Sequence, residues 1–414
     1  MREMKDSGIE WVGAIPQDWQ LSKIGSLYTQ RNEKVSDKDY QPLSVTMQGI
    51  LPQLATAAKT DDGDNRKLVR AGDFAINSRS DRRGSCGISP LDGSVSLINI
   101  ILTPRTAMHP GYYNWLFHTT LFADEFYKWG HGIVADLWTT RWQEMKSITV
   151  PVPEYAEQER IAAFLDAECA EIDTVLEKTR ASIEEYKKLK QAVITQAVTK
   201  GIRGDRPMKD SGIEWIGDIP AEWSVVPFSK FARVSTNLVN PSDYQDYLQV
   251  SPENIEKDSG KLLPCKTVSE VGVESWNHFF HKGQILYSKI RPKLNKVCIA
   301  PFDGLCSADM YPIDTDNISK FVVYTILSND FNQQVAMITE NRVKMPKINQ
   351  KELSKIIVVL PANRMEQQEI VDYLDGECEK IDALIAKKQQ YLTEIENYKK
   401  SLIYEYVTGK KEVV

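Results

Sequence analysis

The chain has 414 residues, of which 42% are hydrophobic and 26% are charged, and its formal net charge is −6 at pH 7. The composition is typical of a soluble globular protein, and the length fits two to four domains rather than one. No apolar run reaches the roughly 18 residues that cross a bilayer, and the N-terminus lacks the apolar core of a secretion signal. We therefore expect a cytoplasmic protein without membrane contacts.

The chain opens with a segment that it later repeats. Met4–Trp11 returns unchanged as Met208–Trp215, and each copy continues with Gly, Ile-Pro and a second tryptophan, Trp19 in the first copy and Trp223 in the second. These segments are rich in Trp, Gly and Pro and have no helical periodicity. We expect each to be an ordered lead-in whose tryptophans pack against a neighbouring element, with stacking on a nucleic-acid base as the alternative.

The stretches that follow the two lead-ins differ from each other in sequence but share a plan. Both consist of short apolar runs broken by Gly, Asp, Asn and Pro, with one longer segment of helical spacing. Each is expected to be a mixed α/β domain with a sheet. In the first stretch strands are expected at 72–77, 94–98 and 148–153 and a helix at 111–127. In the second stretch strands are expected at 284–288, 296–300 and 356–361 and a helix at 319–340.

After each closing proline the sequence changes to a long helical pattern. Residues 157–199 contain no Gly or Pro, and apolar residues recur there every seven positions. This heptad spacing, found in both copies, predicts a coiled coil. The expected interface residues are Leu165, Ile172, Tyr186 and Val193 in the first copy and Leu374, Ile381, Ile395 and Leu402 in the second. A second seam is expected at Val175, Leu189, Leu384, Tyr391 and Tyr398.

The ends of these helices also carry signals. Asn363 with Glu366 predicts a capping box at the start of the second helix, and Gly201 and Gly409 stand at matching C-terminal stops. Two helices of similar length and seam should pack on each other, antiparallel, and set the distance between the two domains. In the alternative, each helix docks on its own domain as an ordinary amphipathic helix.

The expected fold class is therefore α+β: two mixed α/β domains joined by two long helices that form an antiparallel coiled coil, with a pseudo-two-fold internal repeat. The expected boundaries are 1–153 for the first domain, 154–203 for the central helix, 204–361 for the second domain and 362–414 for the C-terminal helix.

Residues for catalysis are scarce. The sequence has no phosphate-binding loop and no glycine-rich dinucleotide turn. The six cysteines and five histidines show no metal-ligand spacing, and Cys169 and Cys378 are interpreted as packing residues. Asn240–Asp243 lacks the aromatic residue that a flipped adenine needs. Asp61, Asp62 and Asp64 could form a metal-binding cluster, although a solvated turn is the simpler interpretation.

Cationic residues gather in two places despite the net negative charge. Ser78–Gly84 follows an expected strand in the first domain, and Ser288–Lys296 follows its counterpart in the second, where residues 281–301 include no acid. Arg and Lys contact phosphates and guanine, so both runs predict contact with DNA. The candidate DNA-binding residues are Arg79, Arg82, Arg83 and Arg141 in the first domain and Lys289, Arg291, Lys293, Lys296, Arg342 and Lys344 in the second.

Taken together, these motifs resemble the specificity (S) subunit of type I restriction–modification systems over nearly the whole chain. The resemblance rests on the doubled lead-in, on the helix starts at Ala156–Ile161 and Glu366–Ile370, and on the Leu-Asp…Ile-Asp pattern that begins at Leu165 and Leu374. The helix ends at 197–201 and 406–409 complete it.

The resemblance implies a subunit that is not itself an enzyme. Each variable domain would be a target recognition domain that reads one half of a bipartite, asymmetric double-stranded DNA sequence. The helices would set the gap and dock two methyltransferase (M) subunits, and restriction (R) subunits would complete the complex. S-adenosylmethionine, ATP and magnesium would bind to the partners and no cofactor to this chain. The alternatives are a stand-alone nuclease or methyltransferase that uses Asp61–Asp64, and a two-headed protein-interaction adaptor.

Overall fold

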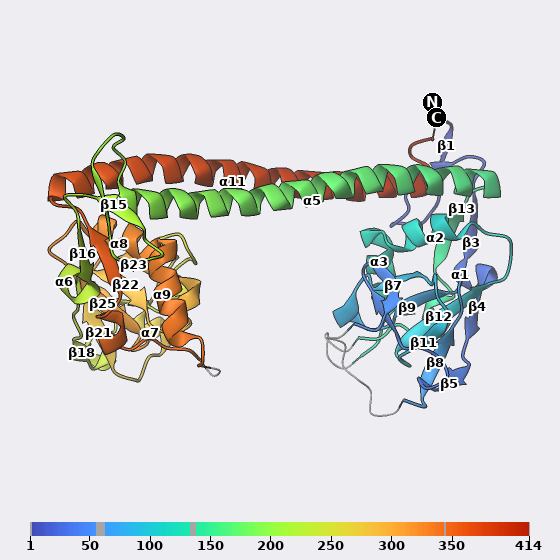
Figure 1. Cartoon of the computed structure of the whole chain (residues 1–414). Helices are drawn as coiled ribbons and strands as arrows, with labels where there is room; N and C mark the ends of the chain where they lie inside the picture. The colour runs from blue at the N-terminus through green and yellow to red at the C-terminus, as the bar shows by residue number, and fades with distance from the viewer. Residues whose placement is uncertain (1, 55–62, 133–137, 343–344, 414) are drawn as a thin grey trace. The chain divides into compact units, whose positions relative to one another are not determined.

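The computed structural model describes residues 2–54, 63–132, 138–342 and 345–413. They divide into two compact units, unit 1 from Met1–Arg180 with Gln390–Val414, and unit 2 from Ala181–Gln389. Two long helices, α5 (Tyr155–Lys200) and α11 (Arg364–Val407), each begin in one unit and end in the other (Figure 1). No helix in the described ranges is both long enough and apolar enough to span a membrane.

Unit 1 contains a mixed α/β body. Its largest sheet has four antiparallel strands in the order β10-β9-β12-β4, and smaller sheets β11-β8-β5, β6-β7, β13-β3 and β1-β2 surround it. The strands are β1 Met4–Asp6, β2 Ala14–Pro16, β3 Gln20–Lys23, β4 Tyr28–Arg31, β5 Lys34–Val35, β6 Leu43–Thr46, β7 Gly49–Pro52, β8 Arg66–Val69, β9 Phe74–Asn77, β10 Cys86–Ile88, β11 Gly93–Val95, β12 Asn99–Pro104 and β13 Thr149–Val152. The short helices are α1 Ile24–Leu27, η1 Ser80–Arg82 (a 3₁₀ turn), α2 Pro110–Phe117, α3 Thr120–Lys128 and α4 Trp142–Met145.

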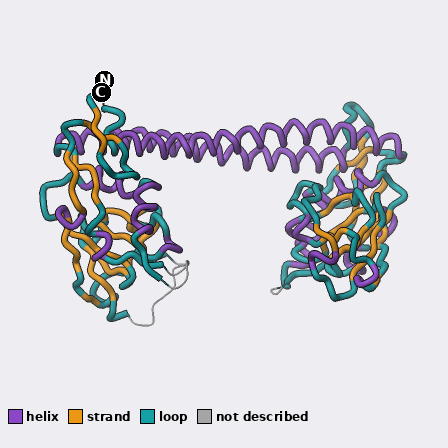
Figure 2. The backbone as a smooth tube through the Cα atoms, turned by 180° about the vertical axis from the view of Figure 1, so that it is seen from behind, coloured by secondary structure: helices purple, strands orange, loops and turns teal. Residues whose placement is uncertain are grey.

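Unit 2 contains a second mixed body with strands (orange in Figure 2) in sheets ordered β17-β25-β22-β23, β18-β21-β24-β19-β20, β16-β26 and β14-β15. The strands are β14 Met208–Asp210, β15 Asp218–Pro220, β16 Ser224–Pro227, β17 Arg233–Val234, β18 Leu238–Val239, β19 Leu248–Val250, β20 Lys266–Thr267, β21 Asn277–Phe280, β22 Ile285–Ser288, β23 Val297–Ile299, β24 Gly304–Cys306, β25 Met310–Asp314 and β26 Ile357–Leu360. The short helices are α6 Phe228–Phe231, η3 Pro241–Asp243, η4 Pro252–Asn254, α7 Val268–Val271, η5 Pro292–Leu294, α8 Ser319–Leu327, α9 Asn329–Thr339 and α10 Gln350–Leu353.

The four-stranded sheets of the two units are equivalent. In sequence order, β4, β9, β10 and β12 of unit 1 take the same neighbours as β17, β22, β23 and β25 of unit 2. Two helices follow in each unit, then a one-turn helix and a closing strand that pairs with β3 or β16. Domains of the same plan therefore fold from sequences that show little similarity.

The two long helices pair antiparallel within each unit. In unit 1 the Phe164 and Tyr406 rings lie 4.4 Å apart, and Asp173 forms an ion pair with Lys399 at 2.6 Å. In unit 2 Lys190 pairs with Asp382 at 2.8 Å. Because residue numbers rise along α5 as they fall along α11, the predicted antiparallel coiled coil is confirmed, and the alternative of separately docked helices is wrong.

The predicted first seam faces inward. Leu165, Leu374, Ile381 and Leu402 are buried, and Ile172, Tyr186, Val193 and Ile395 are half-buried.

The predicted second seam is wrong, because each residue assigned to it is exposed: Val175, Leu189, Leu384, Tyr391 and Tyr398. The actual second seam lies four residues after the first seam rather than three, and it passes through Cys169, Leu176, Ile183 and Lys190 on α5. Cys and Lys at these positions hide the heptad pattern, since neither residue marks an apolar stripe in the sequence.

Two single helices predicted from spacing are pairs of helices. The expected helix at 111–127 is interrupted at Thr119, whose hydroxyl accepts a hydrogen bond from the Phe122 N–H and starts α3. Ser328 does the same for α9 through the Phe331 N–H. Hydroxyl residues at these positions cap a new helix instead of continuing the old one. The expected strand at 94–98 ends at Val95.

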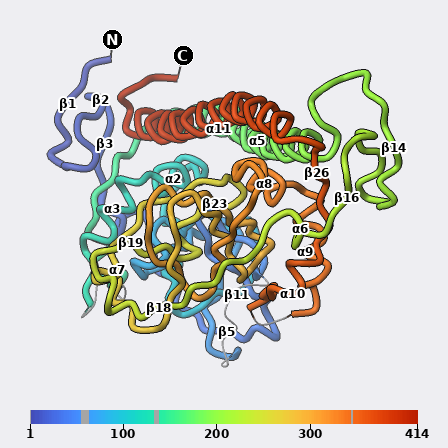
Figure 3. Tube along the Cα trace, turned by 90° about the vertical axis from the view of Figure 1, so that its left-hand side faces the viewer, coloured from blue at the N-terminus to red at the C-terminus, as the bar shows by residue number. Residues whose placement is uncertain are grey.

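Each lead-in covers the end of a long helix. In unit 1 Lys410, just past the end of α11, donates hydrogen bonds to the Val12 and Ala14 carbonyl oxygens at 2.6 Å and 3.2 Å, and Figure 3 shows this end beside β1 and β2. In unit 2, Ile216 and Ile219 pack in one cluster with Val198 of α5. Packing is confirmed for Trp11, Trp19 and Trp223, whereas Trp215 is 48% exposed and the expectation for it is wrong.

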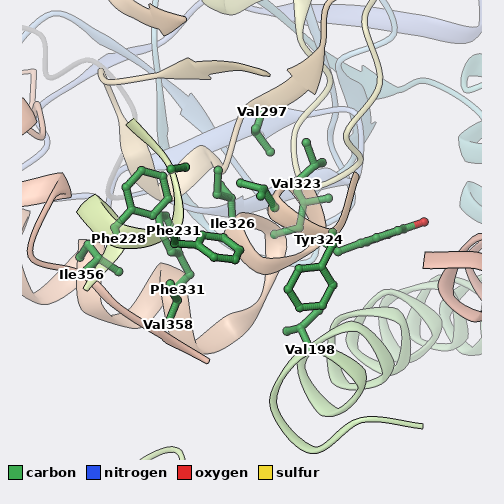
Figure 4. Close-up of a cluster of buried hydrophobic side chains, with 14 of the residues drawn as sticks. Val198, Phe228, Phe231, Val297, Val323, Tyr324, Ile326, Phe331, Ile356 and Val358 are labelled. Atoms are coloured by element: carbon green, nitrogen blue, oxygen red, sulfur yellow. The ribbon is translucent and has the colours of Figure 1, made fainter. Parts of the chain in front are cut away.

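The core of unit 2 joins its domain to the long helices. Phe228, Phe231 and Phe331 pack with Val358 of the closing strand and Val198 of α5 (Figure 4). Unit 1 has its own core, in which Trp19, Tyr112 and Phe117 pack with Leu165 of α5 and Leu402 of α11. In each unit the larger hydrophobic cluster of the domain therefore includes residues of the helix pair.

Candidate nucleic-acid interface

The basic run of the first domain occupies the turn between β9 and β10. Strand β9 is buried along its whole length and Ser78 after it is buried too, so the chain must turn outward to expose Arg79 and Asp81–Arg83. The Arg79 N–H donates to the Asn77 side-chain oxygen at 3.0 Å, and the backbone of Arg79 forms an isolated antiparallel β-bridge with Thr139. Arg79 therefore projects from a fixed backbone at the edge of the sheet.

The basic run of the second domain occupies the equivalent turn, between β22 and β23. Arg291 and Asn295, on either side of η5, have φ values of 44° and 45°, in the left-handed region that non-glycine residues seldom adopt. The Arg291 N–H donates to the Pro346 carbonyl at 2.8 Å, and Pro292 is buried. Strained backbone that is held in place in this way is concentrated at functional sites.

The candidate cations differ in how they are engaged. Arg83 pairs with Asp124 and Arg342 with Glu352, while Arg82 lies 3.8 Å from Asp81. Lys296 donates to the Pro252 carbonyl at 2.6 Å, and Lys289 lies over the Tyr311 ring.

Within the described residues, four of the candidates have charged groups that pair with no carboxylate and are exposed: Arg79, Arg141, Arg291 and Lys293. Lys344 lies outside the described residues. The assignment of these residues to DNA binding stays a prediction.

The sequence did not reveal the group of polar side chains through which each domain contacts its long helix. We call this group the joint. In unit 1 the Glu157 carboxylate accepts a hydrogen bond from Trp19 Nε1 at 2.9 Å and pairs with Arg2. The Arg2 guanidinium lies over the Trp19 ring, 5.6 Å from its centroid, and also pairs with Asp18 at 2.7 Å. The hydrogen bond to Glu157 holds the pKa of Arg2 above its ordinary value.

Unit 2 repeats this joint with equivalent residues. Glu366 accepts from Trp223 Nε1 at 3.0 Å and pairs with Arg206, which also pairs with Glu222 and lies 5.4 Å from the Trp223 centroid. Glu366 is 2% exposed. Its side chain contacts Trp223 and Arg206 and therefore does not form the expected capping box. Asn363 still caps the helix, since its side chain accepts from the Glu366 N–H at 2.9 Å.

The glutamine beside each of these glutamates anchors the domain at a second point. Gln158 accepts from the His109 N–H at 2.9 Å, and Gln367 from the Ile318 N–H at 3.0 Å. His109 and Ile318 immediately precede α2 and α8. The repeated Glu-Gln pair was visible in the sequence as a motif, but its role depends on partners far away in the chain.

The cysteines are packing residues, as expected for Cys169 and Cys378, which are buried. Burial raises the pKa of the Cys169 thiol to about 11 and that of Cys298 to about 12, so neither is a thiolate at neutral pH. Asp61 and Asp62 lie outside the described residues, whereas Asp64 accepts a hydrogen bond from Ser36 at 2.6 Å. No group of three or more potential metal ligands occurs among the residues with described positions.

Parts of the chain are similar in sequence to known proteins. Residues 226–397 match the family described as type I restriction modification DNA specificity domain. The specificity subunit of the type I restriction enzyme EcoDI from Escherichia coli is 35% identical over 286 residues, which are 64% of this chain and 63% of that subunit. The chain thus resembles type I specificity subunits over part of its length, and its match spans less than two thirds of that curated relative.

Solved structures extend the likeness in fold over nearly the whole chain. One comes from work on the structural basis of complex assembly and conformational transition of the type I R-M system. Its chain has a TM-score of 0.72 and 14% identity, with 96% of this chain and 99% of that chain covered. The HsdS subunit from Thermoanaerobacter tengcongensis has a TM-score of 0.49 and 15% identity, with 96% and 98% covered. At such identity, the likeness of the first structure concerns the fold alone.

Proposed function

We propose that this chain is the DNA-recognition subunit of a type I restriction–modification complex. It reads a bipartite, asymmetric target in double-stranded DNA and carries no catalytic site of its own. The observation that carries the proposal is the duplicated joint: the same Arg, Trp and Glu seat two domains of one plan on one helix pair, while the exposed turns of the domains differ in sequence. A repeated frame with different contact surfaces suits a protein that reads two different half-sites.

The helix pair supplies the second part of the proposed role. Large apolar side chains are exposed on its outer faces, at Val175, Tyr391 and Tyr398 in unit 1 and at Leu189 and Leu384 in unit 2. Exposed apolar residues at heptad spacing are suited to packing further helices. Two methyltransferase subunits would dock there, and restriction subunits would complete the complex. S-adenosylmethionine, ATP and magnesium would bind to those partners.

The test is to express the chain in a host together with a type I methyltransferase subunit and to map methylated adenines by single-molecule sequencing. We expect one motif with two unlike half-sites and a fixed gap. A palindromic motif would contradict the two-reader arrangement, and the absence of any motif would contradict the function.

The rival functions make different predictions for the isolated chain. A nuclease or methyltransferase would turn over DNA with magnesium or with S-adenosylmethionine alone, and a change of Asp62 would abolish the activity. A protein-interaction adaptor would show no DNA affinity that falls with rising salt. We expect the isolated chain to bind DNA weakly, with that salt dependence, and to leave it chemically unchanged.

A further inference from the structure

Unit 1 has a hollow of about 420 Å³ beside the turn that carries Arg79. Lys67, Arg79 and Arg141 line it, together with Gln30 and Asn32. No carboxylate is among its described lining residues, although the chain as a whole is acidic. Three cations with no acid between them form a local positive field that the net charge of the chain conceals.

The two arginines come from segments that are tied together. Arg79 bridges to Thr139, the Thr140 N–H donates to the Ser78 carbonyl at 3.0 Å, and the Ser80 N–H donates to the Trp138 carbonyl at 2.9 Å. The Glu144 carboxylate accepts from the Arg141 N–H at 2.9 Å and fixes the start of α4. Both guanidinium groups therefore start from a rigid backbone on the same rim.

Strands of the sheets contribute further residues to the lining of the hollow. Gln30 belongs to β4 and pairs with Leu102 of β12. Lys67, in β8, is half-buried, and its ammonium group donates to the Asn99 carbonyl at 2.7 Å. That hydrogen bond holds the Lys67 side chain at a fixed place in the hollow, while the longer arginine side chains stay exposed at the rim.

A recessed cationic site fits a DNA backbone better than a base edge. Base edges lie inside the grooves, so a protein reads them with elements that project, whereas phosphates form ridges that a hollow can receive. Arginine, lysine and carboxamide donors are the groups that contact phosphate oxygens. We propose that this hollow is a seat for backbone phosphate of the target DNA, with Lys67, Arg79 and Arg141 as its cations.

This inference rests on the proposed function and deepens it. The hollow sets the register of the first domain on its half-site and does not choose the bases, which other residues of that domain read. Arg79 and Arg141 are then positioning contacts, and Lys67, Gln30 and Asn32, which the sequence did not single out, belong to the same site.

The test uses the complete complex with its methyltransferase and DNA in which single phosphates are replaced by neutral methylphosphonates across both half-sites. For the wild type we expect affinity to fall on the order of tenfold at one or two positions in a single half-site, because a charge-assisted contact is lost. In Arg79→Ala, Arg141→Ala and Lys67→Met, affinity should already be lower for every sequence, and substitution at those positions should have little further effect. The slope of log K against log salt should fall in magnitude by about one per lost phosphate contact.

The matched control is Lys128→Ala. Lys128 lies in α3 of the same unit and is exposed, but it pairs with Glu10 at 3.5 Å and does not line the hollow. It should keep the wild-type methylphosphonate profile. Variants of the three cations that change base preference at one position, or that keep the full methylphosphonate effect, would overturn the phosphate seat while leaving the proposed function intact. A wild-type complex that binds no specific DNA would overturn both.

Discussion

Each domain is attached to its long helix by a few side chains, and in each case one carboxylate contacts several of the others. Glu366 accepts from Trp223 Nε1 and also pairs with Arg206, in a place where water has little access. A buried carboxylate is stable only when its hydrogen-bonding capacity is used, so the loss of one donor affects the whole group.

Trp223→Phe should lower the free energy of unfolding of unit 2 by about 1–3 kcal/mol, because it removes the indole N–H while keeping most of the ring in the core. Trp215→Phe is the matched control, since Trp215 is 48% exposed and should change stability by less than about 0.5 kcal/mol. Calorimetry of the complete chain measures both. Equal effects for the two variants would contradict the role given to the Glu366 joint.

Gly409 ends α11 with φ of 71°, and an added Cβ would lie 2.5 Å from Pro16 of β2. Gly409→Ala should therefore destabilise unit 1 by more than the roughly 1–2 kcal/mol that left-handed backbone alone costs. Gly376→Ala, inside α11 with no atom within 4 Å of the new Cβ, should instead stabilise the helix by about 0.5–1 kcal/mol. Calorimetric unfolding of the two variants checks the opposite signs.

At the scale of elements, the long helices were predictable because a heptad pattern is local. Their second seam was not, because Cys169, Lys190 and Lys399 occupy interface positions without being conventional apolar markers. Lys190 is 9% exposed and pairs with Asp382, and Lys399 pairs with Asp173. The repeated Ile-Asp of the sequence thus has a physical role, since each aspartate pairs with a lysine of the opposite helix.

Lys190→Ala should loosen the helix pair in unit 2, because Asp382 would keep only the more distant Lys261, at 3.4 Å. We expect faster amide exchange in the α5 segment of unit 2, corresponding to about 1–3 kcal/mol of lost local stability. Lys188→Ala removes an exposed pair with Glu185 on one helix and should leave amide exchange in the same segment unchanged. Similar amide exchange in both variants would show that the Lys190–Asp382 pair does not stabilise the contact between the two helices.

At the scale of the whole molecule, repetition made the architecture predictable from sequence. The copies of the lead-in and of the helix start identified the scaffold, and the basic runs were correctly placed at equivalent turns. What the sequence did not reveal depends on distant partners: Arg83 and Arg342 looked available but pair with acids elsewhere in their units. Lys67 gave no signal because a single lysine in a strand looks like any other until the hollow around it is known.

Inserting one heptad into α5 and one into α11 at paired positions within unit 1 should preserve both seams and lengthen the helix pair by about 10 Å. On the proposed function, the methylated motif should keep both half-sites and gain a longer gap. Sequencing of methylated adenines reads the result directly. A changed half-site with an unchanged gap would contradict the spacing role of the helices.

Unit 1 is built from both ends of the chain, and this affects the order in which the two units fold. Unit 2 is one uninterrupted stretch, whereas unit 1 needs Gln390–Val414 to complete its interior. Since domains fold as their residues leave the ribosome, the half encoded second matures first. The half encoded first waits, with part of its core uncovered, until Gln390–Val414 has left the ribosome.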